Sequence, residues 1–240
     1  MIVHGGWGGG WEWEAVGRAL RDRGHHAVTP TLSGMGERAR QGHPRVGLGT
    51  HVVDVLEVLE RGDLRDVILC AHSYGGMPVT GAADRAANRI RLVIYIDALI
   101  PLDGQSAFDV LPAAFRELAR ETADAEGDDW RVPIPASLLP PQGWVSDEER
   151  ARYVERLCDQ PLATFAEPVE LTGAIDRLPR AFVRCTGAEL GRDLGGDPIA
   201  LMAERARRDG WPYRELVAPH DPQLTDPNGT ATVLHELATS

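Results

Sequence analysis

Several features of secreted and membrane-bound proteins are missing from this sequence. No apolar run approaches the roughly 20 residues that a membrane-spanning helix needs. The N-terminus has no basic region followed by an apolar stretch, so no secretory signal is visible. The three cysteines, Cys70, Cys158 and Cys185, are far apart and form no CxxC pair. Such cysteines are typical of reduced, mostly buried thiols, and we therefore expect a cytoplasmic protein that does not associate with membranes.

Signals for metal and nucleotide binding are also lacking. The eight histidines show no HxxxH or similar spacing, so we predict no metal site. The glycine-rich run 5–10 has neither GK[ST] nor GxGxxG followed by an acidic residue at the right distance, which argues against phosphate binding. The net charge of −11 disfavours nucleic acid and acidic membranes as partners. The expected partner is a small-molecule substrate, handled without a cofactor, and a homodimer is left open.

The apolar pattern predicts one large α/β domain, because 240 residues are enough for a sizeable core. Short apolar runs alternate with segments of helical periodicity, as in parallel sheets whose two faces are covered by helices. The expected architecture is a three-layer α/β/α sandwich with a mostly parallel sheet of about six strands. The expected strands are 1–4, 26–31, 67–70, 92–98, 181–185 and 213–217, and the expected core helices are 11–20, 50–60 with Thr50 as N-cap, 77–87, 198–210 and 227–240.

The middle of the chain, residues 101–179, interrupts this pattern. It holds nine of the 17 prolines and no convincing strand. Helices are expected at 108–121 and 147–158, and the second begins with a capping-box pair, Ser146 and Glu149. Because long insertions in compact domains are usually functional, we interpret this segment as a helical lid between the two core segments, which are 1–100 and 180–240. The alternative is a surface excursion with no role in binding.

A serine lies between the central strand and the helix that follows it. The segment Ala71-His72-Ser73-Tyr74-Gly75-Gly76 directly follows the apolar run 67–70. A strand, a sharp turn with serine at its apex and a helix form a nucleophile elbow, which needs small residues two places before and after the serine. Gly75 meets this need, and Ala71 stands where glycine is more usual. We therefore predict a nucleophilic serine; the alternative is an ordinary glycine-rich turn with an idle one.

His220 is the predicted general base for this serine. A serine hydroxyl needs a base to take its proton and an acid to orient that base, in the chain order serine, acid, histidine. His220 directly follows the last expected strand, whereas His72 is expected to point away from the serine and His235 lies on the final helix. The developing oxyanion needs two backbone N–H groups, which we expect from Gly6 and Tyr74.

Four segments carry a family resemblance: 3–11 (VHGGWGGGW), 30–38 (PTLSGMGER), 71–76 (AHSYGG) and 95–101 (YIDALIP). They resemble the α/β-hydrolase fold family, and in particular its small bacterial members similar to plant methylesterases and hydroxynitrile lyases. The resemblance implies the same nucleophile, base and oxyanion donors that the residues indicate. It also implies that the first two strands of larger members are absent here.

The acid has two main candidate positions. Methylesterase-like members carry it just after the strand that here ends at Cys185, where Glu189 stands one place late; Asp193 and Asp197 fit the register less well. Asp97 closes the strand next to the nucleophile strand, and certain haloalkane dehalogenases resemble this arrangement. An Asp that ends an apolar strand is hard to bury unless something pairs with it. We therefore favour Asp97 over Glu189, with a merely capped strand end as the alternative.

These residues and the resemblance predict a serine hydrolase that cleaves a small-molecule ester, lactone or thioester through an acyl-enzyme. Hydroxynitrile lyases of the family have Lys and Thr at the positions of Asp221 and Gly5, so cyanohydrin cleavage is not expected. Trp7, Trp130 and Trp144 are candidate substrate-binding residues, with core or lid packing as the alternative. A lyase or cyclase that uses the same histidine as base, and a non-catalytic ligand receptor, are the alternative functions.

Overall fold

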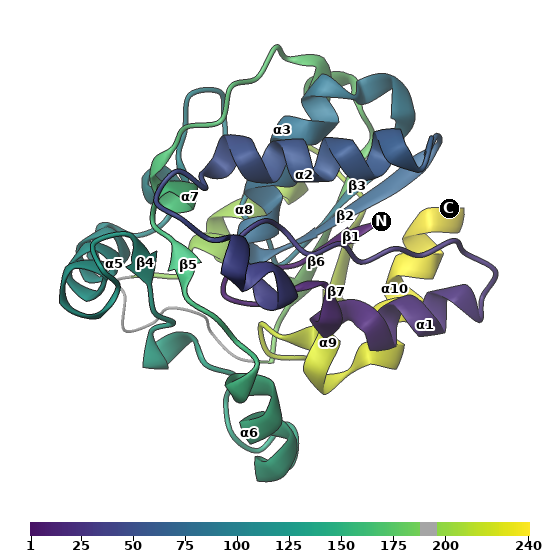
Figure 1. Ribbon diagram of the computed structural model, residues 1–240. Coiled ribbons are helices and arrows are strands. Elements are labelled where there is room, and N and C mark those ends of the chain that lie inside the picture. Colours follow the sequence, from purple (N-terminus) through teal and green to yellow (C-terminus); the bar gives the residue numbers. More distant parts are fainter. Residues whose placement is uncertain (188–195) are drawn as a thin grey trace.

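A parallel sheet of five strands forms the centre of the protein in the computed structural model, which describes residues 1–187 and 196–240 (Figure 1). Every pair of neighbouring strands in this sheet is parallel. The predicted α/β class is therefore confirmed. In their order across the sheet, the strands are β1 (Ile2–Val3), β2 (Val67–His72), β3 (Ile90–Ile96), β6 (Arg180–Cys185) and β7 (Tyr213–Leu216).

Helices cover both faces of this sheet. They are α1 (Glu14–Arg21), α2 (Leu48–Arg61), α3 (Gly76–Arg85), α8 (Pro198–Arg208), α9 (Pro222–Thr225) and α10 (Pro227–Thr239). Val93 and Tyr95 of β3 pack in a buried cluster with α2, α3 and α8, whereas Ile94 and Ile96 pack in a second cluster with α1 and α10. Successive side chains of a strand point to opposite faces, so one apolar strand supplies both layers. Figure 1 shows α2 and α3 on one side of the sheet and α1 and α10 on the other.

The expected strand 26–31 is missing from the sheet, which has five strands where about six were expected. Residues 25–32 have no regular secondary structure. They run beside β1, and the N–H of Ile2 donates to the carbonyl of Val28 at 2.9 Å. Pro30 has no N–H to add to a ladder. The apolar pattern therefore identified a chain segment next to the sheet that does not become a strand.

Two helix starts differ from the sequence prediction. Gly47, not Thr50, is the N-cap of α2, and Thr50 lies within the first turn, where its Oγ1 accepts from the Gly47 N–H at 3.4 Å. The helix expected at 11–20 divides into a 3-10 turn and α1. The 3-10 turns are Gly10–Trp13, Gly36–Gln41, Ser73–Gly75, Ala87–Arg89, Ala136–Leu138 and Ala174–Arg177.

In the described parts of the chain, no helix has the length and apolar character required to cross a membrane.

The insertion 101–179 contains four α-helices joined by longer irregular segments. Its helices are α4 (Ala107–Val110), α5 (Ala113–Glu126), α6 (Asp147–Glu155) and α7 (Ala163–Ala166). Pro112 stands between α4 and α5 and divides the single helix expected at 108–121, because proline interrupts a helix interior. The predicted capping box is confirmed: Ser146 Oγ accepts from the Glu149 N–H, and Glu149 Oε2 accepts from the Ser146 N–H, both at 3.2 Å.

The expectation of no strand in the insertion is wrong. β4 (Arg131–Val132) and β5 (Gln160–Pro161) form a short antiparallel pair. This pair ties the insertion to the loop after β1, because the Trp7 indole N–H donates to the carbonyl of Val132 at 2.8 Å and the Trp7 backbone N–H donates to Gln160 Oε1 at 3.0 Å. The insertion is therefore fixed to the core beside the carboxyl end of β1.

Candidate active site

The turn between β2 and α3 holds Ser73 in a conformation that few residues adopt. Its φ is 52°, in the left-handed region, as expected of a nucleophile elbow. A Cβ on Gly75 would lie 2.5 Å from the carbonyl oxygen of His4 and 2.9 Å from that of Val3, so glycine is required two places after the serine. Ala71, two places before it, is fully buried within β2. The sharp turn therefore passes close to the backbone at the end of β1.

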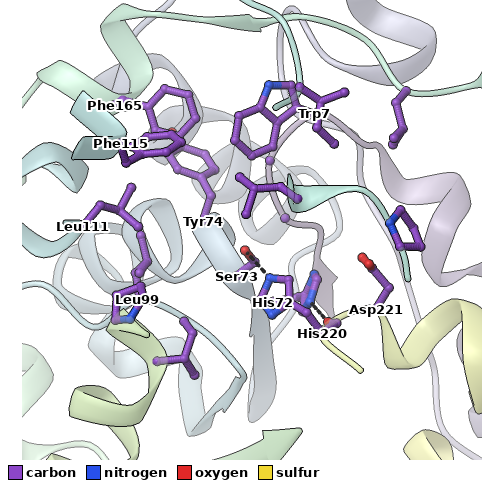
Figure 2. A pocket seen from close by; sticks show the side chains of 18 of the residues that line it. Trp7, His72, Ser73, Tyr74, Leu99, Leu111, Phe115, Phe165, His220 and Asp221 are labelled. Carbon is purple, nitrogen blue, oxygen red and sulfur yellow. Dashed lines mark hydrogen bonds between the residues drawn. The ribbon is translucent and has the colours of Figure 1, made fainter. Parts of the chain in front are cut away.

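Ser73, His220 and Asp97 form a continuous hydrogen-bonded chain. Ser73 Oγ lies 2.9 Å from Nε2 of His220, beside which it appears in Figure 2. Nδ1 of the same ring lies 2.8 Å from Oδ2 of Asp97. A carboxylate can only accept hydrogen bonds, so Nδ1 carries the proton of the neutral ring and Nε2 accepts from the serine hydroxyl. The fold thus brings together the three residues expected to react.

Strand register explains how Asp97 comes to lie near Ser73. His72 and Ile96 are paired residues of β2 and β3, and the two residues that follow them leave neighbouring strands at the same edge of the sheet. Asp97, like the serine, has a positive φ, 44°. His220 comes from the loop between β7 and α9. The carboxyl ends of parallel strands meet at one edge, so all three side chains converge there.

The pKa values of Asp97 and His220 are shifted in opposite directions. Burial alone would raise the pKa of Asp97, but the hydrogen bond and charge of His220 and the charge of Arg184 outweigh it, and the pKa lies below its ordinary value. Burial alone would lower the pKa of His220, but the hydrogen bond and charge of Asp97 outweigh that effect and raise it. Asp97 is therefore ionised at neutral pH and stabilises a protonated His220.

Arg184 binds the oxygen of Asp97 that His220 does not use. Its Nη1 lies 2.9 Å from Oδ1, and the backbone N–H of Cys185 donates to the same oxygen at 3.0 Å. Asp97 is 2% exposed, so a buried carboxylate is matched by one cation, one imidazole and one N–H group. Each of its oxygens is therefore hydrogen-bonded, which a buried charge requires.

Of the other candidates for the acid, only Asp197 lies within the described residues, and its side chain is engaged away from His220. Asp197 binds Nη2 of Arg184 and caps α8, where its Oδ1 accepts from two backbone N–H groups at 2.9 and 3.2 Å. Glu189 and Asp193 lie outside the described residues. Asp97 therefore has the geometry expected of the acid.

Two further histidines, His72 and His235, were not expected to act as the base. His72 donates from Nε2 to the backbone carbonyl of His220 at 2.7 Å, and burial lowers the pKa of His72 to about 3, so its ring is neutral. Its contact therefore holds the loop of the base rather than the serine hydroxyl. His235 lies on α10, with its Nδ1 2.8 Å from Nε2 of His25.

Gly6 and Tyr74, the expected oxyanion donors, both line the cavity that contains Ser73. The ring of His4 fixes the loop before Gly6, since its Nδ1 lies 2.7 Å from the carbonyl oxygen of Gly5. The Tyr74 hydroxyl lies 3.0 Å from Nδ1 of His51, which is fully buried. Both backbone segments are therefore held in place by buried histidines.

The cavity at Ser73 comprises about 840 Å³ of empty space, part of it open to solvent. Its apolar side includes Phe115 and Phe165, and the insertion supplies much of this lining. Figure 2 shows Phe115, Phe165 and Tyr74 to one side of the serine and Asp221 to the other. The cavity therefore has an aromatic side and a polar side, as is typical of small-molecule sites.

Of the three candidate tryptophans, Trp7 alone is among the described lining residues of the cavity. Its ring packs against Phe115 and Phe165, with centroids 6.3 and 5.5 Å apart. Trp130 instead lies under the guanidinium of Arg131, 5.6 Å from its ring centroid, and Trp144 is 38% exposed. Trp130 and Trp144 are therefore not among the described residues that line this cavity.

Sequence reasoning missed Glu12 and Tyr153, which also line the cavity. Glu12 lies in the 3-10 turn before α1 and Tyr153 in α6, and their side chains are hydrogen-bonded although 141 residues separate them. The available signal was a single acidic residue between Trp11 and Trp13. No spacing in the sequence connects that residue to a tyrosine in a distant insertion.

Comparison with known proteins agrees with this geometry. Residues 1–233 match the family described as the Alpha/beta hydrolase family. The chain belongs to this family. Within the described residues, no group of three His, Cys, Asp or Glu side chains could hold a metal ion.

Relatives of this alpha/beta hydrolase are esterases. The chain is 35% identical to a carbendazim hydrolyzing esterase of Nocardioides sp. (strain SG-4G), over 99% of its own length and 98% of the relative's. It is 24% identical to Methylesterase 18 of Arabidopsis thaliana, over 83% and 81% of the two chains. A solved extracellular alpha/beta-hydrolase from a Paenibacillus species shares the fold, with a TM-score of 0.85 at 23% identity over 99% and 97% of the chains. The family and these relatives together support an ester hydrolase.

Proposed function

We propose that this protein is a serine esterase that hydrolyses a small-molecule ester, lactone or thioester through an acyl-enzyme. The observation that carries the proposal is the hydrogen-bonded chain from Ser73 through His220 to Asp97 at the wall of a cavity. The left-handed φ of Ser73 and the esterase relatives add independent support.

In the first half of the reaction, His220 Nε2 takes the proton of Ser73 as Oγ attacks the acyl carbon. The electron pair of the carbonyl double bond moves to its oxygen, and the N–H groups of Gly6 and Tyr74 stabilise that oxyanion. The oxyanion then reforms the carbonyl as the bond to the leaving group breaks. Protonated His220 gives its proton to the departing alkoxide or thiolate, which leaves an acyl group on Ser73.

In the second half, a water molecule replaces the leaving group. His220 takes a proton from the water as its oxygen attacks the acyl carbon, and the same N–H groups stabilise the second oxyanion. When the bond to Ser73 Oγ breaks, His220 returns the proton to the serine and the acid is released. Asp97 stays ionised throughout, holding the ring in one tautomer and stabilising its protonated form.

We also propose that the insertion 101–179 acts as the lid of this site. Leu111, Phe115, Ile134 and Phe165 supply apolar side chains to the cavity. Such a cover excludes water and so strengthens the electrostatic interactions around the serine. The reaction needs no cofactor, and the free cysteines fit the reducing cytoplasm proposed as its location.

The first test is ester hydrolysis by purified protein, with p-nitrophenyl acetate and butyrate as substrates and a fluorophosphonate as the serine label. Carbendazim is a further substrate to try, because a relative is named for its hydrolysis. We expect release of p-nitrophenol and one labelled serine, both lost in Ser73→Ala. Asp97→Asn is expected to lower kcat by about 10³–10⁴-fold, whereas His235→Ala, remote from the cavity, keeps the wild-type rate.

Absence of both hydrolysis and labelling would contradict the proposal. Turnover that survives Ser73→Ala would instead indicate a lyase or cyclase that uses His220 as base without an acyl-enzyme. Ligand binding without any turnover would indicate a receptor on the same fold.

A further inference from the structure

The polar side of the cavity contains a buried carboxyl group, that of Glu12, and a half-buried one, that of Asp221, which the proposed reaction does not use. Glu12, Tyr153 and Asp221, which we call the acidic wall, line the same cavity as Ser73. Glu12 is 8% exposed and Tyr153 6%. The Tyr153 hydroxyl is hydrogen-bonded to Glu12 Oε1 and lies 3.4 Å from Oδ1 of Asp221. One phenol therefore connects two carboxyl groups from distant parts of the chain.

Within the described chain no cation forms an ion pair with the acidic wall, although the charge of Arg156 acts to lower the pKa of Glu12 and that of His220 acts to lower the pKa of Asp221. Among the described residues, no Arg or His nitrogen lies within 4.0 Å of a carboxylate oxygen of Glu12 or Asp221. Burial raises the pKa of Glu12 to about 8, and the charge of Asp221 adds to this shift. Burial also raises the pKa of Asp221. The pKa of Asp97, by contrast, is lowered, because Asp97 is paired with Arg184. A buried carboxylate is stabilised by a cation or by hydrogen-bond donors.

A neighbouring side chain adds a hydrogen-bond acceptor that also lacks a donor. Gln223 is 3% exposed, and its Nε2 donates to the Tyr153 hydroxyl at 3.0 Å and to Asp221 Oδ1 at 3.3 Å. Its Oε1 is buried and has no hydrogen-bond partner among the described residues. Buried polar atoms are nearly always paired, so an unpaired acceptor indicates a missing donor. Glu12, Asp221 and Gln223 thus offer more acceptors than the described chain supplies with donors.

We propose that the acidic wall binds a basic, N–H-bearing nitrogen of the substrate, such as an amine, an amidine or a protonated ring nitrogen. A nearby cation favours the ionised form of a carboxyl group, so it would pair with Glu12 and Asp221 as carboxylates, and its N–H groups would donate to their oxygens. The aromatic side of the cavity would take the apolar part of the same molecule. This assignment names the substrate class of the proposed esterase and rests on that proposed function.

Two structural contacts could also account for the buried carboxyl group of Glu12. Glu12 also accepts from the Gly9 N–H at 3.1 Å, so it has a structural contact that fixes the turn before α1. Tyr153 joins α6 to that turn through Glu12. If the cluster only held these elements together, its removal would change stability without changing which substrate is preferred. Substrate preference is therefore the measurement that separates the two roles.

The test compares methyl 3-(aminomethyl)benzoate with methyl 3-ethylbenzoate, which are similar in shape and differ in one cationic nitrogen. For the wild type, we expect kcat/KM to favour the amine by about ten-fold or more, the effect of one charge-assisted hydrogen bond. In Glu12→Gln and Asp221→Asn the ratio should fall towards one. Glu148→Gln, the same change at an exposed position of α6, should keep the wild-type ratio.

A wild-type ratio of one or less, or a ratio unchanged in Glu12→Gln, would overturn the assignment. Gln can still accept from the Gly9 N–H and donate to Tyr153, so we expect this variant to fold, and thermal melting checks it. If it does not fold, Tyr153→Phe removes the connecting hydroxyl and serves in its place. Its ratio is expected to fall as well, and an unchanged ratio would equally overturn the assignment.

A binding measurement separates this inference from the proposed function. Calorimetric titration of Ser73→Ala with the same two esters needs no turnover. Tighter binding of the amine by about ten-fold, lost when Glu12→Gln is added, supports the acidic wall even if hydrolysis is never observed. Hydrolysis of both esters at equal rates, with equal affinity, would leave the esterase proposal intact and refute the acidic wall.

Discussion

Arg184 Nη1 lies 2.9 Å from Oδ1 of Asp97, on the carboxylate oxygen opposite the one that binds His220. The side chain of Arg184 is 13% exposed and that of Asp97 2%, so the pair is shielded from solvent. A positive charge here keeps Asp97 ionised, and it also opposes protonation of His220 a short distance beyond. Arg184 is therefore linked to His220 through the carboxylate of Asp97.

Arg184→Met is predicted to move the pH dependence of hydrolysis. The base must be neutral, so kcat/KM falls as pH drops through the pKa of His220, which Asp97 raises above its ordinary value. Loss of the nearby cation should raise that pKa further and shift the acidic limb to higher pH. Breaking a buried ion pair should also cost about 3 kcal/mol of stability. Arg152→Met, at an exposed ion pair, is the control, and an unshifted limb would contradict the prediction.

Ser73→Gly is predicted to abolish hydrolysis and to stabilise the fold. At φ 52° a residue with a Cβ is strained, and glycine relieves that strain. We expect the free energy of unfolding to rise by about 1 kcal/mol. Ser73→Ala is the matched variant, since it removes the hydroxyl but keeps the Cβ. Denaturant titration of the two variants checks this, and equal stability would show that the elbow stores no backbone strain.

Gly75→Ala is predicted to destabilise the protein by about 2 kcal/mol or more. The new Cβ would lie 2.5 Å from the carbonyl oxygen of His4, and backbone atoms cannot move aside as a flexible side chain can. Gly49→Ala in α2 is the control, because its Cβ would meet nothing closer than 3.8 Å and helical glycine is itself unfavourable. We expect that control to gain about 0.5 kcal/mol. Urea denaturation of both variants measures the difference.

Glu12→Gln is predicted to remove the loss of stability that the wild type shows as pH rises. The pKa of Glu12 is raised from 4.5 to about 8, so between these values the folded chain keeps a proton that the unfolded chain releases. By linkage, the free energy of unfolding then falls as pH rises through that window. The variant and the wild type should melt alike near pH 4.5 and diverge towards pH 8, with the variant more stable. Glu148→Gln should show no such divergence.

The sequence was sufficient for those features that depend on local pattern or chain order. The elbow at Ser73 follows from small residues around a serine after an apolar strand, and His220 follows from its place after the last strand. The capping box of Ser146 and Glu149 is a pattern of four residues, and it is confirmed. The strand predicted at residues 26–31 is not formed. Composition does not reveal whether an extended segment finds partners for its N–H groups.

Features that depend on contacts between distant segments could not be predicted in this way. The preference for Asp97 over Glu189 rested on the cost of burying a lone carboxylate, and strand register supplies the missing reason. Glu12 and Tyr153 meet across 141 residues, and nothing in either local pattern indicates that meeting. Trp130 and Trp144 were chosen for their chemistry within the insertion, but the side to which each ring turns depends on packing alone.

The insertion contributes none of the three residues proposed to react, yet it lines much of the cavity. The sheet edge supplies Ser73 and Asp97, and the Trp7 and Gln160 contact joins the two parts. Exchange of this segment between homologous enzymes, with that junction retained, is therefore a route to new substrate ranges without rebuilding the catalytic centre. Gene recombination in nature and chimera libraries in the laboratory could exploit the same boundary.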